Sequence, residues 1–189
     1  MTQAQEPNTG NDQVVPLDRD SFMQTMLREL AGVLQDTIGL RDARGFVSIV
    51  GARMGDAIND TYRRTLGSDT LNADQVAHVF VDLKKRIDGD FHVISQNADE
   101  IVLGNNRCPF GPKVRGKPAM CMMTSNVFGR IAAENLGYAR VRVDESFADG
   151  HDRCLVRVAL TRGKDQRKDE REREYYRVGR AQDHAAIED

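Results

Sequence analysis

The stretch that decides the fold is residues 118–160, PAMCMMTSNVFGRIAAENLGYARVRVDESFADGHDRCLVRVAL. Residues 118–136 predict a helix, because a proline suits the first helical position and a glycine suits the position after the last. Residues 138–145 and 154–160 then alternate apolar and polar side chains, which is typical of strands with one buried face. The Asp-Gly dipeptide between them is a strong turn signal. The stretch therefore predicts a helix followed by an antiparallel hairpin.

The residues before this stretch predict three more helices and another hairpin. Apolar side chains recur at helical spacing from about Asp18 to Gly39, from Ala43 to Leu66 and from Asn72 to Gly89. Two short strands, 91–94 and 100–103, follow with turn residues between them. We therefore predict an α+β fold of N-terminal helices, then β-hairpin, helix and β-hairpin, in which the strands form an antiparallel sheet with helices packed on one face.

The composition suits one domain with two polar ends. The chain has 189 residues, of which 40% are hydrophobic and 30% charged, which is enough to build a single core. Residues 1–16 are polar and without periodicity, so we expect a disordered tail. Residues 17–162 are expected to form one α/β domain. Residues 163–189 begin with a mixed-sign charged run, which predicts a solvated helix or tail.

Several classes of function are disfavoured by what the sequence lacks. The formal net charge of -2 does not suit a nucleic-acid binder. We find neither a signal peptide nor an apolar run that could span a bilayer, so we expect a cytoplasmic protein with no membrane partner. Three cysteines are an odd number, which does not suit a disulfide framework, so we expect reduced thiols. No nucleophile elbow, phosphate loop or dinucleotide fingerprint is found, which predicts a protein that is not an enzyme.

The cysteines are the sharpest candidate for a site. Cys108 precedes the helix of residues 118–136, Cys121 lies in its first turn, and Cys154 begins the last strand. With His151 they form a Cys₃His set, which zinc would accept as a tetrahedron; an iron–sulfur cluster is the second choice. Free cysteine also behaves as a small hydrophobe, so burial in the core is the alternative.

A second candidate is the glycine-bearing face of the helix predicted over residues 43–66. Glycines repeated on one face usually let another backbone approach closely, and packing against another element is the first interpretation. The second is that small residues leave room for a ligand. The ligand-binding residues predicted on that interpretation are Ser48, Gly51, Gly55 and Phe128.

Residues 121–160 resemble the vinyl-4-reductase domain, a small-molecule-binding module of regulators. The likeness lies in a cysteine that opens a helix rich in small residues, and in the run Gly150-His151-Asp152-Arg153-Cys154 before a final strand. That family often has a cysteine eight positions before its last one, where this chain has Ser146. The run Cys108-Pro109-Phe110-Gly111 looks more like the related methanogen output domain family, in which Cys108 would replace the missing ligand.

The resemblance implies a sensor of signal transduction. Such modules are usually homodimers that bind a ligand or metal and signal to a partner protein, which is expected here in trans. Two alternatives stay open. One is a metal-free thiol redox sensor, and the other is a plain interaction module that uses the charged C-terminal segment.

Overall fold

The computed structural model describes residues 18–111, 114–163 and 172–178 of the chain. The N-terminal tail expected over residues 1–16 and most of the charged C-terminal segment lie outside the described residues.

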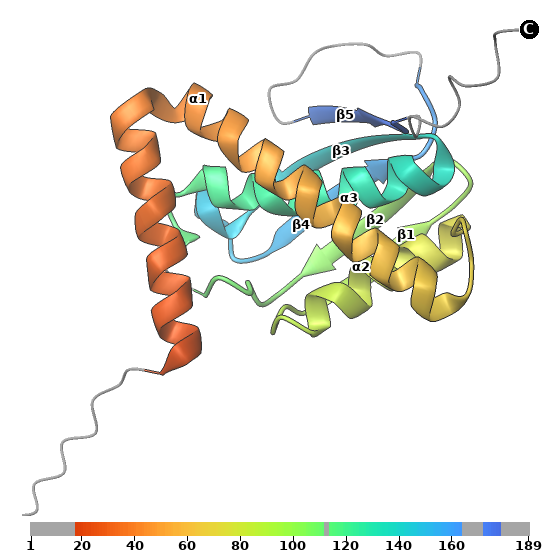
Figure 1. Ribbon diagram of the computed structural model, residues 1–189, viewed down its shortest axis with the longest axis horizontal. Coiled ribbons are helices and arrows are strands. Elements are labelled where there is room, and N and C mark those ends of the chain that lie inside the picture. The colour runs from red at the N-terminus through yellow and green to blue at the C-terminus, as the bar shows by residue number, and fades with distance from the viewer. Residues whose placement is uncertain (1–17, 112–113, 164–171, 179–189) are drawn as a thin grey trace, which may run out of the picture.

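The described residues form an α+β fold, as the sequence predicts. The elements in chain order are α1 (Arg19–Leu66), α2 (Ala73–Lys85), β1 (Phe91–Gln96), β2 (Glu100–Asn105), α3 (Pro118–Leu136), β3 (Tyr138–Glu145), the short 3-10 helix η2 (Phe147–Asp149), β4 (Cys154–Ala159) and β5 (Glu172–Tyr176). The strands pair antiparallel in one sheet of order β1-β2-β4-β3-β5. The helices cover one face of it, and the second half of α1 crosses over α3 (Figure 1).

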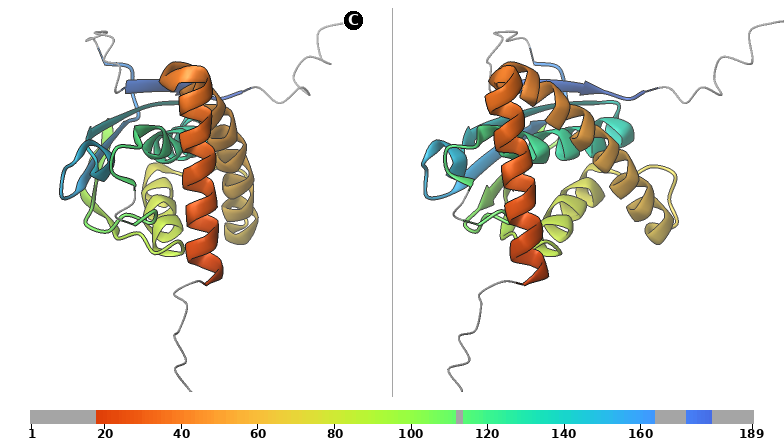
Figure 2. Two further views of the ribbon diagram at one scale, coloured as in Figure 1. Left: turned by 90° about the vertical axis from the view of Figure 1, so that its left-hand side faces the viewer. Right: turned by 60° about the vertical axis from the view of Figure 1, so that its left-hand side comes forward.

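Helix α1 consists of two limbs that meet at Gly39. Asp18 caps its start, with a side-chain oxygen that accepts the backbone N–H of Ser21, and Gly67 ends it in the left-handed conformation. Gly39 has φ 80° and ψ 159°, so it breaks the helix as predicted, but no loop separates the limbs. Figure 2 shows the N-terminal limb standing at one end of the domain. No helix in the described ranges is both long and apolar enough to cross a membrane.

Strand β5 lies within the segment expected to be a helix or tail, of which only residue 163 and residues 172–178 are described. Residues 172–176 pair with β3 and so add an edge strand to the sheet, beyond the domain boundary expected at residue 162. The strand is held because Tyr175 packs against Gly129 of α3, where any side chain would overlap its ring. The sequence does not predict this strand, because its residues are mostly charged and Tyr175 is the one apolar residue on its inward side.

The core lies between the sheet and helices α2 and α3. Phe80 of α2 stacks on Phe128 of α3 with ring centroids 4.2 Å apart, and Phe91 of β1 meets Phe128 edge-on at 5.6 Å. Aromatic pairs of this geometry add stability beyond the area they bury. This cluster fixes α2 and α3 against the sheet, and the candidate site lies at its edge.

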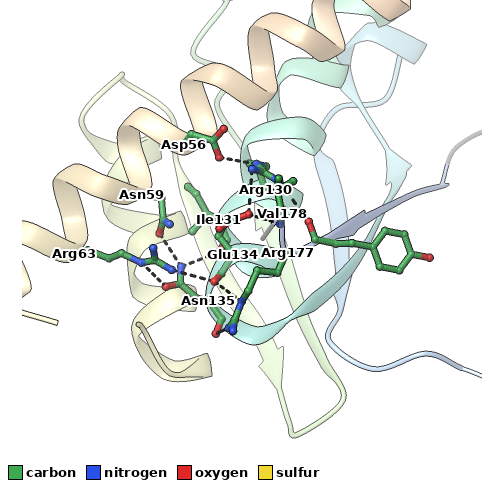
Figure 3. A network of polar contacts seen from close by, with 10 residues as sticks. Asp56, Asn59, Arg63, Arg130, Ile131, Glu134, Asn135, Arg177 and Val178 are labelled. Carbon is green, nitrogen blue, oxygen red and sulfur yellow. Dashed lines mark hydrogen bonds and ion pairs between the residues drawn. The ribbon is translucent and has the colours of Figure 1, made fainter. Parts of the chain in front are cut away.

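A polar network joins α1 to α3 where the two helices cross (Figure 3). Arg130 of α3 binds Asp56 of α1 and also Glu134, one turn further along its own helix, at 3.0 Å. Asn135 of α3 accepts a hydrogen bond from Arg63 of α1 at 3.0 Å. The crossing is therefore held by specific polar contacts as well as by close packing.

Candidate functional site

The structure places all three cysteines on the wall of one pocket, which we call the cysteine pocket. It opens between α3, the 108–110 segment and the strands on that side of the sheet. Its lining residues are Phe91, Asn105, Cys108, Pro109, Phe110, Cys121, Thr124, Val143, Ser146, Cys154 and Val156. Most of this wall is apolar. The cavity volume is about 20 Å³, which is room for a single water molecule. A larger ligand must therefore displace part of the wall.

His151 does not join the cysteines. Its side chain is exposed, and its residue does not line the pocket. Within the described ranges, no group of three histidine, cysteine, aspartate or glutamate side chains could hold a metal ion. The predicted Cys₃His set is therefore not assembled among the described residues, because His151 is exposed and lies outside the pocket lining. The geometry offers no support for zinc or an iron–sulfur cluster.

The three thiols are protonated in this environment. Burial raises the pKa of Cys108 and of Cys154, and it raises the pKa of Cys121 to about 12. Thiolates, not thiols, attack oxidants and bind metals, so these cysteines are poor nucleophiles near neutral pH. This disfavours the thiol redox sensor.

Ser146 stands where the resembling family often has a cysteine. Its residue is buried and lines the pocket. Its hydroxyl accepts the backbone N–H of Asp149 at 3.2 Å and donates to the Asp149 carboxylate at 2.8 Å. The side chain thus caps η2, the turn that leads into β4, and shapes the pocket wall.

Lys84 is the residue that sequence reasoning missed. It lies on α2 and is only 4% exposed, and its ammonium donates a hydrogen bond to Thr124 Oγ1 at 2.7 Å. The same nitrogen lies 5.3 Å and 5.4 Å from the ring centroids of Phe91 and Phe128. Burial lowers the pKa of Lys84 to about 8, and only ionised thiolates of the three cysteines would oppose that shift. The cysteine pocket therefore has a buried amine beside it.

Helical spacing could have located Lys84. Val76, Phe80 and Lys84 follow one another at intervals of four, so the lysine continues the apolar stripe of α2. A lysine on such a stripe usually buries its methylene groups and keeps its ammonium in water. A lysine whose ammonium is buried as well therefore indicates a site. A stripe drawn through Leu83 and Ile87 instead leads away from the core, since Ile87 is 45% exposed beyond the end of the helix.

The face that carries Ser48, Gly51 and Gly55 is occupied by α3, so it offers no room for a ligand. A Cβ on Gly51 would lie 2.6 Å from Asn126 Cβ, and one on Gly55 would lie 2.8 Å from Arg130 Cβ. The packing interpretation of these glycines is therefore the one that the structure supports.

The other two predicted ligand-binding residues are also engaged elsewhere. Ser48 accepts a hydrogen bond from Arg173 of β5 at 2.7 Å. Phe128 is fully buried between Phe80 and Phe91 and does not line the cysteine pocket. None of these four residues lines the cysteine pocket.

The described residues thus form an antiparallel sheet covered by helices on one face (Figure 1), with a small pocket at the edge of its core. The chain belongs to the family of methanogen output domain 1, whose model matches residues 26–159. None of the curated proteins shows a significant match to the chain.

Two solved structures show the same fold at low sequence identity. One is the phenol-responsive sensory domain of the transcription activator PoxR, crystallised with phenol. It is 16% identical with a TM-score of 0.60, and the alignment covers 72% of this chain and 73% of that one. The other is trafficking protein particle complex subunit 3 from Naegleria fowleri, covalently bound to palmitic acid. It is 13% identical with a TM-score of 0.51, and the alignment covers 75% of this chain and 97% of that one.

Proposed function

We propose that this chain is a non-catalytic sensor domain that binds a small ligand in the cysteine pocket and signals as a homodimer to a partner protein. The family and the sensory fold support the class of function. The related folds bind phenol in one case and palmitic acid in the other, and an apolar pocket wall suits ligands of that kind. A catalytic role is disfavoured because Cys121 is protonated and His151 lies outside the pocket.

The observation that carries this proposal is the position of Phe110. Its residue lines the cysteine pocket and also a second cavity, of about 80 Å³, beneath the N-terminal limb of α1. Phe110 and Cys108 pack in one small apolar cluster with Ala31 of that limb. Because the cysteine pocket is nearly filled, an incoming ligand must move part of its wall. Movement of Phe110 would then change its packing against the N-terminal limb of α1.

The outer faces of α1 are suited to pairing with a second copy of this chain. Eleven large apolar residues between positions 22 and 54 are each 36–62% exposed: Phe22, Met23, Met26, Leu27, Leu30, Val33, Ile38, Phe46, Ile49, Val50 and Met54. Monomeric proteins rarely expose so many large apolar side chains on one element, so a run of this kind marks a surface that a partner chain covers.

The N-terminal limb has the spacing of a helix that pairs with its own copy. Met23, Met26, Leu30 and Val33 follow the alternating three- and four-residue steps of a coiled-coil seam. Such a seam is self-complementary, so a two-fold dimer closes it without a second kind of surface. This limb packs on the cluster that contains Phe110. A movement of Phe110 would therefore shift the limb and alter the interface between the two copies.

The dimer is tested by adding charge to this seam. We expect the unaltered chain, of 21.2 kDa, to have twice that mass in solution, and the double variant Leu30→Glu, Val33→Glu to have the single-chain mass, because two buried carboxylates in each copy would face one another. Light scattering after gel filtration measures both, and circular dichroism checks that the variant stays folded.

The matched control is Ile94→Glu, which alters a side chain 53% exposed on the edge strand β1, away from α1. It should remain a dimer. A single-chain mass for the unaltered protein at about 100 μM, or a dimer that persists in the double variant, would show that α1 does not pair copies.

Ligand binding is tested by filling the pocket. We expect at least one of phenol, benzamide, benzoate and hexanoate to raise the melting temperature by about 3–8 °C at a large excess over its Kd, because a ligand that binds only the folded state stabilises it. Cys121→Phe should abolish this shift, since Cys121 lines the cavity and its replacement occupies the space.

Cys121→Ser preserves the volume and is the control; it should keep the shift. Differential scanning fluorimetry provides the measurement. Absence of a shift with all four compounds, or a shift that survives in Cys121→Phe, would contradict a sensor function for this pocket.

A further inference from the structure

Lys84 holds a buried positive charge that the described part of the chain does not balance. Its side chain is 4% exposed, and among the described residues its ammonium donates one hydrogen bond, to the neutral hydroxyl of Thr124. No carboxylate of the described residues lies within ion-pair distance of it. Lysine is almost never fully buried without a partner, because an ammonium loses its hydration there.

The surroundings of this ammonium contain weak partners only. The faces of Phe91 and Phe128 attract a cation, and the Thr124 hydroxyl accepts one of its three protons. The nearby thiols are neutral, since burial raises their pKa values. Two of the three ammonium protons are therefore without an acceptor among the described residues.

The charge lies behind the wall of the cysteine pocket. Thr124 accepts the hydrogen bond of the ammonium, the ring centroid of Phe91 lies 5.3 Å from it, and both residues line that pocket. Lys84 itself is not a lining residue, so an anion that moves Thr124 or Phe91 would reach its ammonium. A cation this close repels a second one, so the pocket is ill suited to a metal ion and better suited to an anion.

We propose that the cysteine pocket recognises a small monoanion, a carboxylate on a compact apolar body, whose oxygens accept hydrogen bonds from the Lys84 ammonium. This inference rests on the proposed function, in which the same pocket is the sensor's ligand site. The ligand carboxylate supplies the missing counter-charge, and the apolar wall contacts its body. A charge-assisted hydrogen bond shielded from water is strong, so the acid is preferred over an uncharged compound of the same shape.

The ligand must be small or must displace the wall. The cavity of about 20 Å³ accepts little more than a water molecule, so even a compact acid moves Cys108 or Phe110 as it enters. These residues pack beneath α1 with Ala31. The same event that satisfies Lys84 therefore alters the contact with α1.

The experiment compares acids with their uncharged amides. Formate, acetate and benzoate are titrated at pH 7 beside formamide, acetamide and benzamide, and affinity is measured by calorimetry. We expect at least one acid to bind tenfold or more tightly than its amide, and Lys84→Met to weaken that acid at least tenfold while leaving amides unaffected. Lys84→Met removes a buried charge and retains an unbranched stem, so it is expected to fold.

The matched control is Lys85→Met, which removes an exposed lysine from the next position of the same helix and should bind like the unaltered chain. Three results would overturn the inference: amides that bind as tightly as acids, acids that bind Lys84→Met undiminished, or acids that bind neither chain. If amides bind and Cys121→Phe abolishes that binding, the sensor function is supported and only the preference for an anion is refuted. An absence of binding by every compound would remove both.

Discussion

Replacing Asn135 with alanine is expected to lower the free energy of unfolding by about 3–5 kcal/mol. Asn135 is 5% exposed, and its oxygen accepts hydrogen bonds from the Leu71 backbone N–H at 2.9 Å and from Arg63 at 3.0 Å. Its amide nitrogen donates to Asn59 Oδ1 at 2.7 Å and to the Ile131 carbonyl at 2.8 Å. This side chain thus joins α1 to α3 (Figure 3). Through the Leu71 N–H it also holds the link between α1 and α2.

Truncation leaves several buried groups without partners. The Leu71 N–H and the Asn59 amide remain buried, and each unsatisfied group costs about 1–3 kcal/mol. Urea unfolding followed by circular dichroism measures the loss. Asn106→Ala is the control, because Asn106 is exposed and should change stability by less than about 0.5 kcal/mol. A loss below about 1 kcal/mol in Asn135→Ala would show that the network does not hold α1 on α3.

Gly129→Ala is expected to destabilise the fold by about 3–4 kcal/mol, because the new methyl group overlaps the Tyr175 ring. Tyr175 must then leave its place between β5 and α3, and its hydroxyl loses the hydrogen bond to Asn126 Oδ1, which is 3.0 Å long. Strand β5 is an edge strand with little else to bury, so its pairing with β3 weakens too.

The same substitution should be harmless once the ring is gone. In a Tyr175→Ala background, Gly129→Ala is expected to be neutral or to stabilise by up to about 1 kcal/mol, since alanine is the better helix former. Urea unfolding of the four chains completes a double-mutant cycle. Equal losses in both backgrounds would mean that Tyr175 does not pack on Gly129 and that β5 is not part of the folded sheet.

The local elements could be predicted because their signals are local. The bounds of α3 follow from Pro118 and Gly137, and β3 and β4 follow from alternation over a few residues. Strand β5 could not be predicted in this way. It is held by Gly129, more than forty residues away in the sequence, and by pairing with β3, so its own residues carry mostly charge.

The candidate site divides along the same line. The sequence shows three cysteines at the ends of elements, and adjacent elements bring Cys108, Cys121 and Cys154 to one wall. It does not show that His151 faces outward, nor that Lys84 turns inward from a helix that precedes the sheet. Both depend on the rotation of a side chain relative to a distant partner, which short-range periodicity does not encode.

By itself the sequence determined the α+β class and the elements before β5, because hydrophobic periodicity and the residues that begin and end each element act over a few positions. Only the tertiary structure decided that the glycines of α1 receive α3, and that the cysteine pocket has an amine beside it in place of a metal set. The physical reason is that packing and buried charge depend on residues far apart in the chain, whose contacts form only when the helices dock on the sheet.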